Sequence, residues 1–386
     1  MIPLVEVNVE SLGRIITGKT PSKKVANYFG GKFQFVTPSD FAYKHYFCRK
    51  TETTVTEAAQ EKHKNQFIPA GSIMFTCIGS TIGKCAIASE ECLTNQQINS
   101  VIPHNKSESK FIYYLLNPHV VVNHHMGVFR GIGLSGGAAM PIINKTDFSK
   151  VILKAPSKSF WPAIGMLLSE YDDLIENNRR RIQLLEDSAH LLYKEWFVHL
   201  RFPGHEQVKI TDGVPEGWSK EPLENLLVLQ RGFDLPVSKR VDGKVPIYAS
   251  TGINGFHNVA KVNGPGVVTG RSGSLGTVMY VARDFWPLNT ALWVKQFKKA
   301  SPIFATFLLR AMKLEGYNGG AAVPTLNRND VHKVDVLCPA ENLMNEFELQ
   351  VENIFKQIDK LKEFNEKLAQ ARDVLLPKLM SGELTV

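Results

Sequence analysis

The segments GGAAMPIINKTDFSKVILKAPS (residues 136–157) and GGAAVPTLNRNDVHKVDVLCPA (residues 319–340) decide how this chain folds. Ten of their 22 positions are identical at a constant offset of 183 residues. Upstream of them, GSTIGKCAIA (79–88) resembles SGSLGTVMYV (272–281), and FIYYLL (111–116) resembles FATFLL (304–309), both at an offset of 193 residues. The same order of elements repeated at so long a period is typical of a duplicated domain and not of a solenoid.

A long helix is predicted after each repeat, because apolar positions in 160–197 and 341–376 recur at alternate spacings of four and three residues. This period is typical of a coiled-coil seam, so we expect the two helices to pair, antiparallel if a two-fold relates the halves. Two independent amphipathic helices, each lying on its own domain, are the alternative. Asn178, Gln350 and Gln357 also fall in the seam, where polar groups fix register at a cost in stability. The seam residues predicted with most weight are Ile175, Ile182, Leu185 and Leu192 in the first helix and Ile354, Leu361, Phe364 and Leu368 in the second.

Strand-like runs alternate with Gly, Asn and Pro turns within each half, at 32–36, 72–78, 245–250, 266–270 and 277–282. One short helix per half is predicted, at 111–117 and 304–313. The expected fold class is α+β, with two similar mainly-β domains joined by two long antiparallel coiled-coil helices and an internal pseudo-two-fold. The expected boundaries are 1–157 for the first domain, 158–199 for the central helix, 200–340 for a linker and the second domain, and 341–386 for the C-terminal helix and tail.

Composition limits the class of protein. The 386 residues suffice for two to three domains, and 44% hydrophobic with 21% charged residues is typical of a globular chain. No apolar run reaches the length of a membrane span, and MIPLVEVNVE lacks the features of a signal peptide. Five Cys without a CxxC pair argue for reduced thiols and against disulfides or a zinc knuckle. We therefore expect a cytoplasmic protein without a membrane segment; its net charge of +8 is compatible with a polyanionic partner.

Motifs of catalysis are incomplete throughout the chain. GIGLSG (131–136) reads as GxGxxG, but Pro141 blocks the helix that a dinucleotide site needs. GSTIGKC (79–85) has one residue too few for a phosphate loop and ends in Cys85 in place of Ser or Thr. Asn117-Pro118-His119-Val120 lacks the aromatic residue of an amino-methyltransferase motif, and His124-His125 has no partner at metal-ligand spacing. We predict a non-catalytic chain with no metal site.

Each half instead offers basic, Gly-rich loops. Glycine allows the backbone to approach a phosphate closely, and Arg can fork onto guanine O6 and N7. Ordinary solvation of each Lys and Arg is the competing interpretation, and the case for binding depends on matching loops in both halves. The candidate DNA-binding residues are Lys19, Thr20, Lys84 and Arg130 in the first half and Arg231, Arg271 and Ser272 in the second.

The chain resembles the specificity subunits of type I restriction–modification enzymes over nearly its whole length. Seven motifs carry the resemblance, and the most specific is LLPKLMSGEL, which lies directly after the second long helix. They are TGKTPS (17–22), NQQINSVIP (95–103), GGAAMPIINKTDF (136–148), VPEGW (214–218), GRSGSLG (270–276), AAVPTLNRND (321–330) and LLPKLMSGEL (375–384).

The resemblance implies a first target-recognition domain up to about residue 157 and a second over about 215–340, each reading one half of a split, asymmetric sequence in double-stranded DNA. It implies that the long helices space these domains and dock two modification subunits, which transfer the methyl group, and that restriction subunits translocate and cleave DNA. S-adenosylmethionine, ATP and magnesium are then expected on those partners and no cofactor in this chain. At an offset of 193, Ile78 lies opposite Arg271 and Lys84 opposite Thr277, so the loops differ as two different half-sites require.

Two other functions remain open. A self-sufficient DNA methyltransferase or nuclease needs a cofactor loop and an Asn/Asp-Pro-Pro-aromatic motif, and neither is found. A protein-binding scaffold with two β-rich heads on a coiled-coil rod is the other alternative, and it predicts no sequence-selective DNA retention even with modification subunits added.

Overall fold

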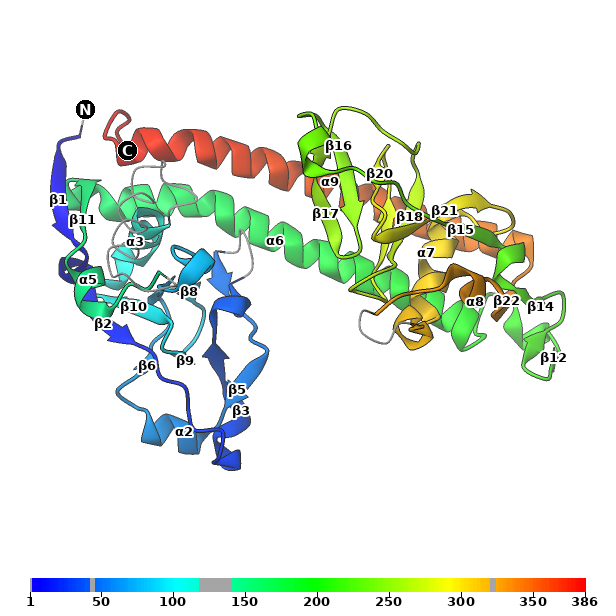
Figure 1. Cartoon of the computed structure of the whole chain (residues 1–386), viewed down its shortest axis with the longest axis horizontal. Coiled ribbons are helices and arrows are strands. Elements are labelled where there is room, and N and C mark those ends of the chain that lie inside the picture. Colours follow the sequence, from blue (N-terminus) through cyan, green and yellow to red (C-terminus); the bar gives the residue numbers. More distant parts are fainter. Residues whose placement is uncertain (1, 42–45, 118–140, 320–323) are drawn as a thin grey trace. The chain divides into compact units, whose positions relative to one another are not determined.

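The computed structural model describes residues 2–41, 46–117, 141–319 and 324–386 (Figure 1). The chain forms two compact units. The first unit contains Met1–Arg180 and Lys362–Val386, and the second contains Arg181–Leu361. Each unit therefore combines one β-rich domain with the beginning of the long helix that follows it and the end of the other long helix.

The first unit is built on a five-stranded sheet in the order β2-β10-β7-β8-β4 and a four-stranded sheet in the order β5-β3-β9-β6. A separate antiparallel pair, β1 with β11, brings residue 4 opposite residue 156. Helix α3 packs its apolar face on β7 and β8 of the five-stranded sheet, and Phe75, Phe111 and Phe148 are fully buried in the core. The strands are β1 (Leu4–Asn8), β2 (Gly13–Thr17), β3 (Phe29–Val36), β4 (Phe47–Cys48), β5 (Thr53–Val55), β6 (Phe67–Ile68), β7 (Ile73–Thr76), β8 (Cys85–Ala88), β9 (Cys92–Thr94), β10 (Ile98–Pro103) and β11 (Ile152–Pro156), and the short helices are α1 (Val9–Leu12), α2 (Glu57–Lys62), α3 (Ser109–Leu116) and α5 (Lys145–Ser149).

The second unit repeats this plan. Its four-stranded sheet has the order β15-β21-β18-β19, which matches β2-β10-β7-β8, and β14 pairs with β22 as β1 pairs with β11. A three-stranded sheet, β17-β16-β20, and the hairpin β12-β13 complete it, and α7 packs on β18 and β19 as α3 packs on β7 and β8. The elements are β12 (Ile210–Thr211), β13 (Val214–Pro215), β14 (Ser219–Pro222), β15 (Leu227–Arg231), β16 (Val245–Ala249), β17 (Gly252–His257), β18 (Gly266–Gly270), β19 (Val278–Val281), β20 (Trp286–Pro287), β21 (Ala291–Phe297), β22 (Asp335–Cys338), α7 (Pro302–Ala311) and α8 (Arg328–His332). The duplication, the strand runs and the two short helices predicted from the sequence are confirmed.

The long helices are α6 (Trp161–Tyr193), which continues as a π-helical turn over Lys194–Val198, and α9 (Glu341–Met380). In the first unit Asp172 pairs with Arg372 and Asn178 with Asn365, so positions that ascend along α6 descend along α9. The helices are antiparallel there, as predicted. None of the helices in the described part of the chain is long and apolar enough to cross a lipid bilayer.

The α6 side of the seam lies where the hydrophobic period placed it, with Ile175 buried and Asn178 buried. Seven of the eight named seam residues are buried or half-buried. Ile175 and Leu368 are buried, and Ile182, Leu185, Leu192, Ile354 and Leu361 are half-buried.

On α9, at every second predicted seam position, the residue that lies in the seam is the one that follows the predicted residue. Phe364 is 49% exposed, and Asn365 takes its place in the seam, where its Oδ1 accepts a hydrogen bond of 2.9 Å from Asn178 Nδ2. Gln350 and Gln357 are likewise exposed. The seam assignment of Phe364 is therefore corrected to Asn365. Hydrophobic periodicity favours the aromatic residue, but a polar residue can take a seam position where a partner on the facing helix satisfies its hydrogen bonds.

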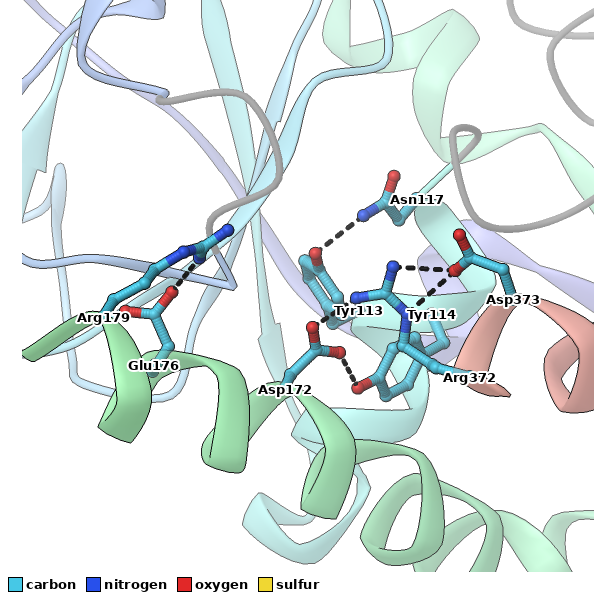
Figure 2. A network of polar contacts seen from close by, with 8 residues as sticks. All are labelled: Tyr113, Tyr114, Asn117, Asp172, Glu176, Arg179, Arg372 and Asp373. Carbon is cyan, nitrogen blue, oxygen red and sulfur yellow. Dashed lines mark hydrogen bonds and ion pairs between the residues drawn. The ribbon is translucent and has the colours of Figure 1, made fainter. Parts of the chain in front are cut away.

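A buried polar network joins the first β-rich domain to both long helices (Figure 2). Asp172 on α6 accepts hydrogen bonds from the Tyr114 hydroxyl of α3 and from Arg372 Nη1 of α9. Arg372 also donates to Asp373 Oδ1 from Nε at 2.9 Å and from Nη2 at 2.7 Å. Burial raises the pKa of the Asp172 carboxyl, against the charge of Arg372 and the hydrogen bond from Tyr114, which lower it. The Asp172 and Arg372 side chains are 3% and 8% exposed, so the pair depends on its geometry.

Candidate nucleic-acid interface

A glycine follows the first strand of the main sheet in both units. Gly18 comes directly after β2 and Gly232 directly after β15. A Cβ atom on Gly18 would overlap the carbonyl oxygen of Asn95, and one on Gly232 would overlap that of Leu288. After the strand, the backbone therefore passes so close to a neighbouring backbone segment that only glycine fits at this position.

The residue after each glycine continues this contact. The Lys19 N–H donates to the Thr94 carbonyl at 2.8 Å, and the Phe233 N–H donates to the Pro287 carbonyl at 2.8 Å. Thr20 Oγ1 donates to Gln96 Oε1 at 2.6 Å. The predicted residues Lys19 and Thr20 thus lie beside the loop between β9 and β10, with the Lys19 side chain exposed.

The Gly-rich loops are held in both units by the segment that follows the GGAA repeat. The Gly79 N–H donates to the Pro141 carbonyl at 2.8 Å, and the Gly273 N–H donates to the Pro324 carbonyl at 3.0 Å. The two prolines are 183 residues apart, as in the repeat, and the two glycines are 194 residues apart, one more than the offset of 193 between the loop segments. In each unit, the Gly-rich loop and the proline segment, which are far apart in the sequence, therefore lie side by side and are joined by a hydrogen bond.

The same contact corrects the predicted alignment of the loops. The Ile143 N–H donates to the Cys77 carbonyl at 2.9 Å, and the Leu326 N–H donates to the Arg271 carbonyl at 2.8 Å. Cys77, and not Ile78, is therefore the counterpart of Arg271. The alignment at constant offset missed a local shift of one residue, because only the hydrogen bonds reveal it.

A pocket of about 310 Å³ opens at this place in the second unit. Three arginines line it from three elements: Arg231 ends β15, Arg271 begins the Gly-rich loop and Arg328 begins α8. The other lining residues are Leu292, Thr325, Leu326, Asn327 and Asn329, so the lining contains no acidic residue. Sequence reasoning named Arg231 and Arg271 but missed Arg328, although Arg328 lies in the repeated motif AAVPTLNRND.

His332 holds α8, and with it Arg328, against β15. Its Nε2 accepts a hydrogen bond of 2.9 Å from the Leu229 N–H. Burial lowers the pKa of His332, and the charges of Arg328 and Lys298 lower it further, against the charge of Glu224, which raises it. The ring is therefore neutral near pH 7 and Nε2 is free to accept.

The equivalent place in the first unit contains a neutral polar cluster. Thr17 and Cys77 stand where the second unit has Arg231 and Arg271, and Asn99 bridges them. Thr17 Oγ1 donates to Asn99 Oδ1 at 2.6 Å, and Asn99 Nδ2 donates to Cys77 Sγ at 3.2 Å. Cys77 and Asn99 are both buried.

The remaining predicted residues are separated in the described structure. Lys84 precedes β8 with its side chain half-buried, and its carbonyl accepts a hydrogen bond of 2.9 Å from the Thr76 N–H. Ser272 follows Arg271 in the Gly-rich loop and forms an isolated bridge with Thr325. Arg130, with the GIGLSG segment and His124-His125, lies outside the described residues.

Comparison with known proteins agrees with these features. The family model described as "Type I restriction modification DNA specificity domain" matches residues 1–187. The type I restriction enzyme MjaIX specificity subunit of Methanocaldococcus jannaschii is 27% identical over 98% of this chain and 93% of its own length. The type I restriction enzyme HindI specificity subunit of Haemophilus influenzae is 32% identical over 39% of this chain and 31% of its own length.

A solved structure shares the fold. The crystal structure of the type I restriction–modification S subunit from M. genitalium superposes with a TM-score of 0.57 at 16% identity, and the match covers 98% of this chain and 96% of that one. With the duplicated units, the antiparallel helices and the matching sequences, the predicted resemblance is confirmed. Residues 1–187 match the type I DNA specificity domain, and nearly the whole chain is similar to type I restriction–modification specificity subunits.

Proposed function

We propose that this chain is the DNA specificity subunit of a type I restriction–modification complex and that each β-rich domain reads one half of a split, asymmetric site. The observation that supports this most is the repeated frame described above. Both units present the same glycine exit and the same tie between the Gly-rich loop and the proline segment, yet with different side chains. Equal frames with unequal side chains are what two readers of different half-sites require.

The proposed DNA contacts come from the loops around this frame. Lys19, Thr20 and Lys84 serve the first domain, together with Arg130 outside the described residues, and Arg231, Arg271 and Ser272 serve the second. Cations in such loops supply affinity through phosphates and make binding steeply dependent on salt. A smaller number of side chains reads base edges in the groove.

The long helices are proposed to set the spacing of the two half-sites and to dock two modification subunits. Leu184 and Leu191, seven residues apart on α6, are 60% and 58% exposed, and Leu349 on α9 is 69% exposed. Exposed apolar side chains along one helix indicate an interaction surface. Restriction subunits would join the assembly through the modification subunits.

The specificity subunit is not itself an enzyme. In the proposal, methyl transfer with S-adenosylmethionine belongs to the modification subunits, and ATP- and magnesium-dependent translocation and cleavage belong to the restriction subunits. No cluster of His, Cys, Asp and Glu side chains that could hold a metal is found among the described residues. The role places the chain in the cytoplasm, with the DNA and its partners.

Base-resolved methylation mapping tests the proposal. DNA is sequenced from cells that contain this chain with its modification subunit, and from cells that lack the chain. A split, asymmetric methylated motif that disappears with the chain is the expected result. Exchange of residues 1–157 for the first domain of another specificity subunit should then change one half of the motif and leave the other intact.

The absence of any chain-dependent motif, with a confirmed complex and an active modification subunit, would contradict the proposal. It would favour the two-headed protein-binding scaffold. A motif in which both halves change on exchange of the first domain would contradict the assignment of one half-site to each domain.

A further inference from the structure

The pocket of the second unit concentrates positive charge without a counter-charge. Arg231 and Arg328 are exposed and Arg271 is half-buried, and within the described part of the chain none of the three forms an ion pair. Three guanidinium groups around one pocket of about 310 Å³ repel one another, and an anion between them relieves that repulsion. The pocket is therefore arranged for a negatively charged group.

Hydrogen bonds hold Arg271 in place through its backbone and its side chain. The Arg271 N–H donates to the Thr290 carbonyl at 2.9 Å and its carbonyl accepts from the Leu326 N–H at 2.8 Å. Its Nη1 donates to the Asn289 carbonyl at 3.3 Å, which orients the guanidinium and leaves its other N–H groups available. A site built on such supports is positioned before the ligand arrives.

The arrangement fits a phosphate better than a base. Recognition of guanine needs one planar guanidinium that reaches out to O6 and N7 in the groove. Here three guanidinium groups approach a concave site from three elements, which suits an anion with several oxygens in different directions. We propose that this pocket receives a backbone phosphate of the DNA bound by the second domain, an inference that rests on the proposed function.

Among the described residues, the first domain does not repeat this group of three arginines. Its counterparts of the three arginines are Thr17, Cys77 and Lys145, the last being the first residue of α5 as Arg328 is of α8. Thr17 and Cys77 are engaged with the buried Asn99, so only one cation remains. The two domains consequently hold the DNA backbone differently, and among the described residues this three-arginine phosphate site is a feature of the second domain.

The test measures how salt affects DNA binding by the full chain in complex with its modification subunit. Fluorescence anisotropy with a mixed-sequence duplex gives the association constant between 50 and 200 mM salt. Arg328→Ala and Arg231→Ala, both at exposed positions, should each lower the slope of log K against log salt by up to about 0.9, the share of the one phosphate in the pocket. That slope change makes the loss of affinity about 3–4-fold larger at 50 mM than at 200 mM. Lys145→Ala is the matched control and should leave the slope unchanged.

A second arm identifies the source of the phosphate. Duplexes that contain the recognised site and a single methylphosphonate, scanned along each strand, should weaken wild-type binding at each contacted phosphate. At one of these positions, in the half-site of the second domain, the methylphosphonate should leave binding by Arg328→Ala unchanged. Inorganic phosphate at constant ionic strength should compete only weakly. Strong binding of inorganic phosphate with no methylphosphonate effect would assign the pocket to a free anion and overturn the proposal.

Two further results would also overturn it. An unchanged salt slope with a relaxed methylation motif would make the arginines base readers. An equal loss of slope in Lys145→Ala would remove the asymmetry between the domains. If the wild-type complex itself shows no chain-dependent motif, the proposed function fails, and that outcome is distinct from an unchanged slope in an otherwise sequence-selective complex.

Discussion

Substitution of Arg372 by Met tests whether the buried network joins the first domain to the helices. The variant leaves the Asp172 carboxylate almost fully buried with the Tyr114 hydroxyl as its remaining hydrogen-bond donor among those described above. Removal of one member of a buried ion pair costs about 3–5 kcal/mol of unfolding free energy. For a unit of this size, that corresponds to a fall in Tm of about 6–20 °C.

Substitution of Asp172, the other member of the ion pair, should lower the free energy of unfolding by less. In Asp172→Leu the Arg372 guanidinium keeps its hydrogen bonds of 2.9 and 2.7 Å to Asp373, which is half-exposed. We expect a loss of about 1–3 kcal/mol, the penalty of one unsatisfied side of a buried charge. The double variant Asp172→Leu/Arg372→Met should recover most of the loss, since a well-packed apolar pair often replaces a buried ion pair without cost.

The second unit has apolar residues at the positions that correspond to the Asp172–Arg372 ion pair. At the offset of 183, Phe355 corresponds to Asp172 and the buried Ala189 corresponds to Arg372. At the offset of 193, Phe307 corresponds to Tyr114, and the Phe307 and Phe355 rings lie 6.0 Å apart. Apolar packing at this junction is therefore compatible with the fold.

Urea unfolding of the full chain, followed by circular dichroism, gives the free energies, and hydrogen exchange of the α3 amides assigns the change to the first unit. Lys367→Met, which removes an exposed ion pair with Glu363 on the same helix, is the control and should change stability by less than about 1 kcal/mol. The deficit of Arg372→Met should shrink as the pH falls. Because burial raises the pKa of Asp172 in the folded state, folding favours its protonated form, and stability is lost as the pH rises. Wild-type stability in Arg372→Met, or a double variant no more stable than that single variant, would refute the reasoning.

Two further predictions concern the second unit. Gly232→Ala should destabilise the unit and abolish DNA binding, because its Cβ would overlap the Leu288 carbonyl oxygen. Gly316→Ala is the control, since a Cβ there meets no neighbour, and it should leave stability and DNA binding unchanged. Equal melting temperatures of the two variants would contradict this prediction. Stability should fall as the pH drops through about 6.5, the value for unfolded His, because the lowered pKa of His332 disfavours its protonation in the folded state. His332→Gln retains a hydrogen-bond acceptor for the Leu229 N–H and should flatten this decline between pH 7.5 and 5.5, and an unchanged pH dependence would exclude His332 as its source.

Sequence alone determined the duplication, the order of strands and short helices in each half, the two long helices and the family resemblance. These features are encoded locally. A repeated motif needs no knowledge of what it contacts, and a helix with a heptad pattern shows its period in the order of its residues. The seam on α6 followed from that period, down to the buried Asn178.

Only the tertiary structure decided the register of α9 and the composition of the arginine pocket. Asn365 is half-buried and Arg372 is buried because Asn178 and Asp172 satisfy their hydrogen bonds, and a hydrophobic pattern cannot show a partner that lies nearly 200 residues away. At the repeat offset of 183, Asn365 corresponds to Ile182 and Arg372 corresponds to Ala189, so the repeat would have placed Asn365 and Arg372 in the seam. In the hydrophobic pattern, however, the aromatic Phe364 is the stronger candidate.

The pocket shows the same limit. Arg231, Arg271 and Arg328 lie on three separate elements of the chain, and nothing in their local sequence says that they converge. Strand pairing and the tie between the Gly-rich loop and the proline segment bring them together. Convergence of charge is a property of long-range hydrogen bonds and packing, so it exists only once the chain has folded.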